Sequence, residues 1–220
     1  MKKTIMILLA SAVCAFANAQ NEWEEMDRQQ EQKELPKSER SNPDSKYLAG
    51  AVPLVAGRVA FAADIAAPGK SAAEIFNAIK AYMERLTRQP NQLEHSTVAL
   101  ADEQNRQLVG SYQEWLVFKS NALVLDRTRF YYTLRVDCAD GMAKVVMSRI
   151  YYLYDEERNP VTYRAEEWID DANGLNSKKN KLARLSGKFR RKTIDRKDYL
   201  FAKLDEILNG KKKDKLNDVK

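Results

Sequence analysis

The chain is poor in the residues that build common catalytic sites. It contains one histidine, two cysteines and eight glycines among 220 residues. A single histidine excludes any site that needs two imidazoles and argues against a zinc enzyme. The sequence contains no glycine-rich phosphate loop and no Gly-x-Ser-x-Gly nucleophile elbow. We therefore expect no cofactor and no metal ion, and these absences favour a protein that is not an enzyme.

Long apolar runs are also scarce, and the clearest one lies at the N-terminus. Lys2 and Lys3 precede an apolar stretch from Ile5 to Phe16, and Ala17-Asn18-Ala19 has the small-x-small pattern of a signal-peptidase site. Residues 1–19 are therefore predicted to be a cleavable signal peptide. No later stretch reaches the roughly 20 apolar residues of a transmembrane helix. We expect an exported protein that is periplasmic, associated with the cell envelope or secreted.

The two cysteines leave one alternative for the N-terminus. In a lipoprotein, Cys14 would be lipidated and would anchor the chain, but Ser11-Ala12-Val13 lacks the leucine and the small final residue of such signals. Cleavage after residue 19 leaves Cys138 without an intramolecular disulfide partner. Cys138 lies in phase with alternating apolar residues, which predicts a buried and inert thiol. A catalytic dyad with His95 is disfavoured, because His95 lies in a polar loop.

Charge is distributed unevenly along the chain, whose net charge is +6. Residues 20–45 contain four basic and eight acidic residues, whereas residues 178–220 contain sixteen basic and six acidic residues. The first segment has few apolar residues and is predicted to be a disordered acidic linker. Residues 46–209 are predicted to form a single α+β domain, and residues 210–220 a basic flexible tail.

The hydrophobic periodicity predicts the order of the elements. Residues 58–65 alternate as in a strand, and Ser71 with Glu74 forms a capping box before a helix that ends ahead of Pro90. Helical periodicity returns over residues 164–170 and 195–208. Four strand-like runs lie between the first helix and residue 164. They are Thr97–Ala101, Gln107–Phe118, Leu123–Cys138 and Met142–Tyr154. The order strand, helix, four strands, helix predicts an α+β fold with a mostly antiparallel sheet and its helices packed on one face.

Five stretches of the sequence are similar to a known family. They are Tyr47 to Pro53, Ala67 to Ser71, Leu125 to Tyr132, Ala165 to Trp168 and Gly187 to Asp195. The pattern resembles an exported Bacteroidetes family that carries the domain of unknown function 4468 and has a TATA-box-binding-protein-like (TBP-like) fold. The resemblance implies the strand-helix-four-strand-helix order. It implies no activity and no catalytic residues.

One strand carries a candidate binding face. In the run Leu123–Cys138 the even positions are apolar, while the odd positions include Arg127, Arg129, Tyr131 and Arg135. An open sheet face contacts DNA in the TATA-binding fold, but export makes nucleic acid a poor partner. The alternative is a solvated face with cross-strand ion pairs. Aromatic side chains that face solvent are able to stack on sugar rings; the candidates are Tyr131, Tyr151, Tyr152, Tyr154 and Trp168.

Charged clusters give further candidates. Lys188, Arg190, Arg191 and Lys192 form a candidate basic patch for an anionic partner, and the alternative is an ordinary solvated helix end. Adjacent carboxylates occur at Asp155-Glu156-Glu157, Glu166-Glu167 and Asp170-Asp171, and their polar surroundings predict surface charge.

These features favour a non-catalytic exported binding or envelope-associated module. Its partner would be an anionic envelope component, a glycan or another protein, held by the open sheet face and the basic C-terminal segment. One alternative is a carboxylate-based hydrolase of cell-wall or dietary polymers. Another is a structural or assembly protein with a protein-protein surface.

Overall fold

A seven-stranded antiparallel sheet forms the body of the protein, whose computed structural model describes residues 44–120 and 123–210. The strand order is β1-β2-β6-β5-β4-β3, and β7 pairs with the end of β6. The strands are β1 (Leu54–Val55), β2 (Arg58–Ala66), β3 (Thr97–Asp102), β4 (Gln107–Ser120), β5 (Leu125–Ala139), β6 (Met142–Tyr154) and β7 (Val161–Arg164). The predicted α+β class and mostly antiparallel sheet are confirmed.

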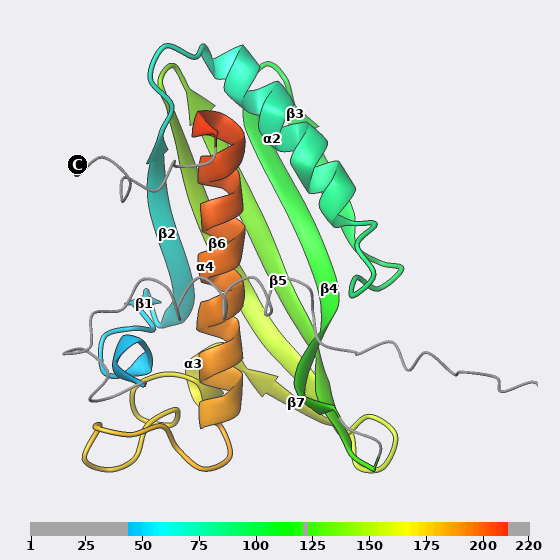
Figure 1. Ribbon diagram of the computed structural model, residues 1–220, viewed down its shortest axis with the longest axis vertical. Coiled ribbons are helices and arrows are strands. Elements are labelled where there is room, and N and C mark those ends of the chain that lie inside the picture. Colours follow the sequence, from blue (N-terminus) through cyan, green and yellow to red (C-terminus); the bar gives the residue numbers. More distant parts are fainter. Residues whose placement is uncertain (1–43, 121–122, 211–220) are drawn as a thin grey trace, which may run out of the picture.

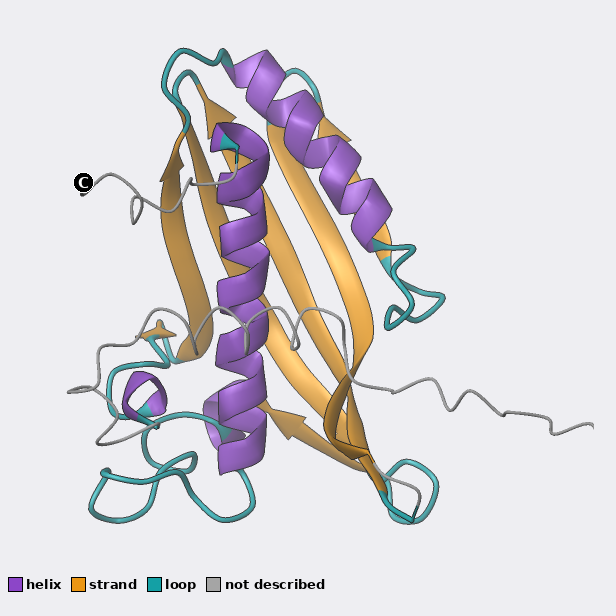
Figure 2. Cartoon of the chain, in the orientation of Figure 1, coloured by secondary structure: helices purple, strands orange, loops and turns teal. Residues whose placement is uncertain are grey.

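Two long helices, α2 (Ala72–Leu86) and α4 (Gly187–Asn209), lie on the same face of the sheet (Figures 1 and 2). The predicted capping box begins α2, because the Ser71 side chain accepts from the Glu74 amide and the Glu74 carboxylate accepts from the Ser71 amide. The short helices are η1 (Ser45–Tyr47) and α3 (Ala165–Trp168). Within the described ranges no helix is both long and apolar enough to span a bilayer.

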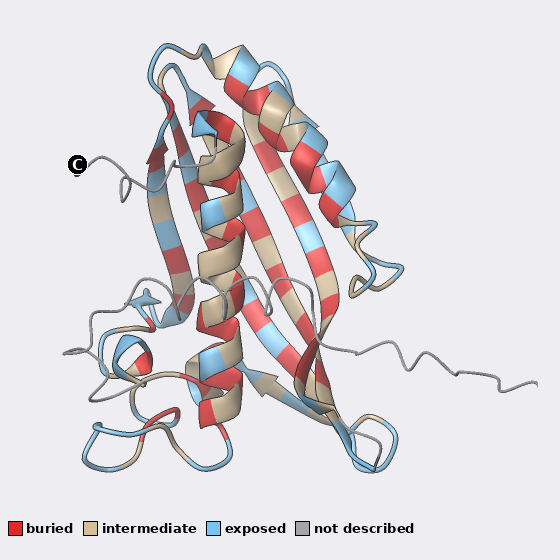
Figure 3. Ribbon diagram, viewed as in Figure 1, coloured by how far each residue is buried: buried red, intermediate tan, exposed pale blue. Residues whose placement is uncertain are grey.

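The core lies between the sheet and these helices (Figure 3). The even positions of β5 from Thr128 to Cys138 face the helices and are buried. Ile75 and Ile79 of α2 and Leu200 and Leu204 of α4 are buried against them. Because side chains alternate across a strand, the odd positions of β5 lie on the opposite face, where each is half-buried or exposed. The helices therefore leave one face of the sheet open.

The chain crosses from one side of the sheet to the other between β2 and β3. β2 pairs with β6, so that Ala60 lies opposite Ser148, and α2 then carries the chain to β3 at the far edge of the sheet. The pairing of β2 with β6 therefore joins two segments that are far apart in the sequence.

Two expectations about the elements need correction, and others fall outside the described residues. The strands β1 and β7 were not predicted, because segments of two and four residues show no periodicity. Helix α4 begins at Gly187, not at Asp195, and its first turns carry many charges that hide the apolar period. Residues 1–43 and 211–220 lie outside the described residues, and with them the predicted signal peptide, Cys14, nearly all of the predicted linker and the basic tail.

Candidate functional site

The open face of the sheet carries a stacked pair of tyrosines. In the register of β4, β5 and β6, Gln113 lies opposite Tyr131, and Tyr131 lies opposite Tyr151. The rings of Tyr131 and Tyr151 are nearly parallel, with centroids 4.3 Å apart and an interplanar angle of 6°. Tyr151 is 39% exposed. The two side chains therefore form a face-to-face stack on the side away from the helices, and each ring covers one face of the other. We call this pair the tyrosine stack.

The next cross-strand row adds a tryptophan and two arginines. Trp115 lies opposite Arg129, and the guanidinium carbon of Arg127 lies 3.7 Å from the centroid of the Trp115 ring. Arg129 binds Glu156 with two hydrogen bonds, from Nε at 2.5 Å and from Nη2 at 2.7 Å. These hydrogen bonds raise the pKa of Arg129. The tyrosine stack thus adjoins an ordered group of donors and acceptors.

A cleft of about 590 Å³ opens beside this row, where the β4–β5 connection approaches the β6–β7 connection. Its lining is Trp115, residues 123–127 and residues 153–158. The β5 side contributes the apolar residues Leu123, Val124 and Leu125, whereas the β6 side contributes the acidic run Asp155 to Glu157. Trp115, Arg127 and Glu156 belong to both the face and the cleft, so the two form one continuous surface.

The structure brings three of the four predicted face residues together. Arg127, Arg129 and Tyr131 occupy consecutive odd positions of β5, next to Trp115 and Tyr151. Arg135 lies four residues beyond Tyr131, or about 13 Å along an extended strand. It forms an ion pair with Asp137 and does not take part in the aromatic group.

The remaining aromatic candidates lie on the helix side. Tyr152 is fully buried and shares a hydrogen bond with Thr193 at 2.6 Å. Tyr154 and Trp168 both pack edge-on against Phe189 of α4. Of the five predicted stacking residues, Tyr131 and Tyr151 are the two that the open face presents.

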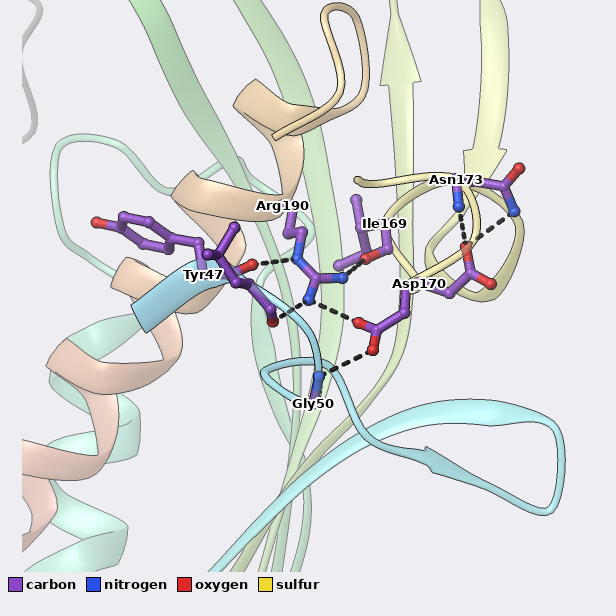
Figure 4. Close-up of polar contacts among 8 residues, drawn as sticks. Tyr47, Gly50, Ile169, Asp170, Asn173 and Arg190 are labelled. Carbon is purple, nitrogen blue, oxygen red and sulfur yellow. Dashed lines mark hydrogen bonds and ion pairs between the residues drawn. The ribbon is translucent and has the colours of Figure 1, made fainter. Parts of the chain in front are cut away.

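The predicted basic patch is wrong at Arg190, whose side chain is completely buried. Its guanidinium donates to the carbonyl oxygens of Tyr47, Leu48 and Ile169 over 2.6 to 2.7 Å, and to the carboxylate of Asp171 over 2.7 Å. Figure 4 shows the guanidinium between the segment of Tyr47 and the loop of Ile169. Arg190 fixes the start of the folded chain to α4.

The neighbours of Arg190 point in other directions, because successive residues of a helix are about 100° apart. Lys188 donates to Asp126 over 2.6 Å and to the Tyr154 hydroxyl over 3.0 Å. Arg191 is exposed and forms an ion pair with Asp44. Lys192 is half-buried. The four basic residues are adjacent in the sequence but do not form one basic surface patch in the structure.

A buried ion pair under the helices was not predicted. Both oxygens of Glu114 accept from Arg196, over 2.6 Å from Nε and 2.6 Å from Nη2, and both side chains are 0% exposed. Glu114 also accepts from Asn91 and Gln92, which fixes the loop before β3. The sequence held a signal for this pair, because Glu114 falls in phase with the buried residues of β4.

The isolated reactive residues lie apart from the face. Cys138 is buried, as predicted, and burial raises its pKa to about 11. His95 lies exposed in the loop before β3. Across residues 44–120 and 123–210 there is no cluster of three or more histidine, cysteine or acidic side chains that would hold a metal ion.

Comparisons with known proteins place this architecture in a family. Residues 61–153 match the family model described as a domain of unknown function (DUF4468) with TBP-like fold. A crystal structure of a DUF4468 family protein from Bacteroides ovatus is 37% identical, with a TM-score of 0.71, over 77% of this chain and 96% of that one. A search of curated proteins found no match.

A second solved structure agrees on the fold. A TBP-like protein from Parabacteroides distasonis is 22% identical, with a TM-score of 0.58, over 73% of this chain and 99% of that one. At this identity the likeness shows the fold alone. The resemblance inferred from the sequence is confirmed, and the chain belongs to the DUF4468 family, a family of unknown function with a TBP-like fold.

Proposed function

We propose that the protein is a non-catalytic binding module that holds a glycan on its open sheet face. The observation that carries this proposal is the stack of half-buried Tyr131 and exposed Tyr151 beside Trp115, in which the outer face of Tyr151 would receive the sugar. The C–H groups on one side of a sugar ring form a flat apolar surface, which packs well on an aromatic face. An aromatic pair with one polar edge per ring suits such a ligand, because the phenol hydroxyls reach the sugar hydroxyls.

The charged side chains near the tyrosine stack favour a neutral ligand over an anionic one. Arg129 is already paired with Glu156, and Arg135 with Asp137, so much of the positive charge of the face is neutralised locally. A bidentate arginine-carboxylate pair presents fixed donors and acceptors to sugar hydroxyls. The cleft beside Trp115 then receives the next residue of an oligosaccharide.

The test is a binding measurement on the chain from Gln20 onward, which is the mature form predicted above. Soluble oligosaccharides of cell-wall and dietary polymers are titrated into the protein and into its Tyr151→Ala and Tyr151→Phe variants. We expect the alanine variant to lose at least about tenfold in affinity, or about 1.4 kcal/mol. The phenylalanine variant keeps the ring and should retain most of the affinity. Equal binding by the alanine variant and the unchanged protein would contradict the proposal.

The same titration separates binding from hydrolysis. The cleft contains two exposed carboxylates, Asp155 and Glu157, which a hydrolase would need within about 5 to 10 Å of each other across the scissile bond. A binding module returns the oligosaccharide unchanged after prolonged incubation. Shortened products that disappear in a Glu157→Gln variant would support the hydrolase alternative.

Export is proposed from residues 1–19, which precede the described residues. Mass spectrometry of protein from the native cell distinguishes the two forms that the sequence allows. A mature chain that begins at Gln20 supports cleavage by a signal peptidase. A lipidated Cys14 as the first residue would instead show a membrane-anchored protein.

A further inference from the structure

The loop that leads into α4 has a fixed shape built around one asparagine. The Asn176 side-chain oxygen accepts from the amides of Asn180 and Lys181, and its side-chain nitrogen donates to Asn180. The Asn176 amide donates to the Lys181 carbonyl, and the Lys179 amide donates to the Asn176 carbonyl. We call residues 176–185 the basic loop. Its hydrogen bonds make it an ordered turn.

This turn displays four cations to solvent. Lys178, Lys179, Lys181 and Arg184 are all exposed. None of the four makes an ion pair with a carboxylate in the described part of the chain. No acidic residue occurs between positions 172 and 194. The basic loop is therefore a concentrated positive surface, in which Lys179 also lies close enough to Asp171 to help lower the pKa of that carboxyl.

The adjoining helix is different, although its sequence is equally basic. Helix α4 contains seven basic residues, and at least six of them are neutralised by carboxylates. These pairs are Lys188–Asp126, Arg190–Asp171, Arg191–Asp44, Arg196–Glu114, Lys197–Asp198 and Lys203–Glu206. Compared with this helix, the basic loop leaves more of its positive charge without an ion pair among the described residues.

An apolar side chain accompanies these cations. Leu185 ends the basic loop and is 68% exposed, although it is a large aliphatic residue. Figure 1 shows the basic loop at the end of the molecule where α4 begins. The loop thus combines exposed cations with a projecting aliphatic side chain.

We propose that this end of the domain docks on an anionic lipid surface. The lysines and Arg184 bind lipid phosphates at the headgroup level, while Leu185 enters the boundary of the acyl chains. The combination favours lipid over a soluble polyanion, because only the lipid surface offers acyl chains in which an aliphatic side chain is buried. The basic loop is separate from the tyrosine stack and from the cleft beside it, so this proposal does not depend on glycan binding.

Vesicle co-sedimentation of the chain from Gln20 onward tests the proposal. The vesicles are pure phosphatidylcholine or phosphatidylcholine mixed with phosphatidylglycerol. We expect binding to the anionic vesicles only, with an affinity that falls as salt is added. The triple variant Lys178→Gln, Lys179→Gln, Lys181→Gln should bind roughly a hundredfold more weakly, since each cation contributes about one factor of five.

Matched variants separate the basic loop from general charge. The triple variant Lys70→Gln, Arg85→Gln, Arg88→Gln removes the same charge from α2 and its flanks, and it should keep most of the binding. Leu185→Asp should weaken binding at every salt concentration, because it removes the apolar contact. Thermal unfolding of each variant shows that the fold is intact.

Three results would overturn the proposal. The first is no binding to anionic vesicles. The second is an equal loss in both triple variants, or a loss only when the lysines at 211–215 are neutralised, which would assign binding to net charge or to the tail. The third is binding to heparin with none to vesicles, which would make the basic loop a polysaccharide site.

Discussion

Arg190 donates a hydrogen bond from Nε to the carbonyl oxygen of Tyr47 over 2.6 Å, although the two residues are 143 positions apart in the sequence. The same guanidinium reaches Leu48, Ile169 and Asp171, with no exposure to solvent. A buried guanidinium with all these acceptors is an anchor, and every segment that it touches depends on it. The free energy of unfolding should therefore depend strongly on this one side chain.

Substitution of two adjacent arginines tests this dependence. Arg190→Met should lower the free energy of unfolding by about 3 kcal/mol or more, because buried carbonyls and Asp171 lose their donor. Arg191→Met removes an exposed pair with Asp44 and should cost less than about 1 kcal/mol. Urea denaturation measures both values. Similar losses in the two variants would mean that Arg190 is not an anchor.

Acid should release the same anchor. Partial burial by itself raises the pKa of Asp171, but hydrogen bonds from the Gly50 amide and from Arg190 outweigh it and lower the pKa below its ordinary value. A carboxyl with a lowered folded-state pKa stabilises the fold above its unfolded value of about 3.9, and this stabilisation is lost as the pH falls through the folded-state value. Asp171→Asn should flatten this acid limb in urea denaturation below about pH 4. If the loss of stability at acid pH is the same in this variant and in the unchanged protein, Asp171 is not its cause.

The buried pair of Glu114 and Arg196 should behave as a unit. Arg196→Met leaves a carboxylate buried under the helices and should cost about 3 to 5 kcal/mol. The double variant Glu114→Leu, Arg196→Met removes both charges and should recover much of that loss. A double-mutant cycle in urea measures the coupling, which we expect to be at least about 2 kcal/mol. Additive losses would show that the pair is not coupled.

The thiol of Cys138 should be unreactive in the folded protein. Burial raises its pKa to about 11, so the thiolate is scarce near neutral pH. Labelling with a disulfide reagent at about pH 8 should be slow in buffer and complete in concentrated guanidinium chloride. The unfolded thiol loses its proton near about pH 8.5, so this group's contribution to stability is lost as the pH rises from there toward the folded-state value. Rapid labelling of the native protein would contradict the buried position.

The sequence was sufficient to predict strands β2 to β6 and the first helix. The alternation of apolar residues in β5 is a local pattern that indicates a strand with one buried face. The capping box of α2 is a local pattern that indicates the start of a helix. The same alternation predicted the buried Cys138. The open face also followed from it, because a strand with one apolar face needs only one cover.

The binding surfaces were harder to predict, because they depend on contacts between distant segments. The Tyr131–Tyr151 stack requires a particular register, and that register shifts between Tyr131 and Thr133 where β5 pairs with β6. The basic run of α4 looked like a surface patch, but its charges find carboxylates on other elements. No local pattern distinguishes Arg190, which is buried, from Arg191, which is exposed.

The pairing of β2 with β6 has a consequence for how the chain reaches this fold. During synthesis, Ser148 becomes available to pair with Ala60 only after α2, β3, β4 and β5 have been synthesised. Helix α4, which covers the core, is the last element to be synthesised. Closing such long loops costs chain entropy before the contacts are gained, so folding should be slow for a domain of this size. Until α4 is present, the apolar side of the sheet has no cover. A chain that is truncated before α4 should aggregate, because the apolar face of its sheet stays exposed to solvent. The yield of folded protein should fall as the time of this exposure increases.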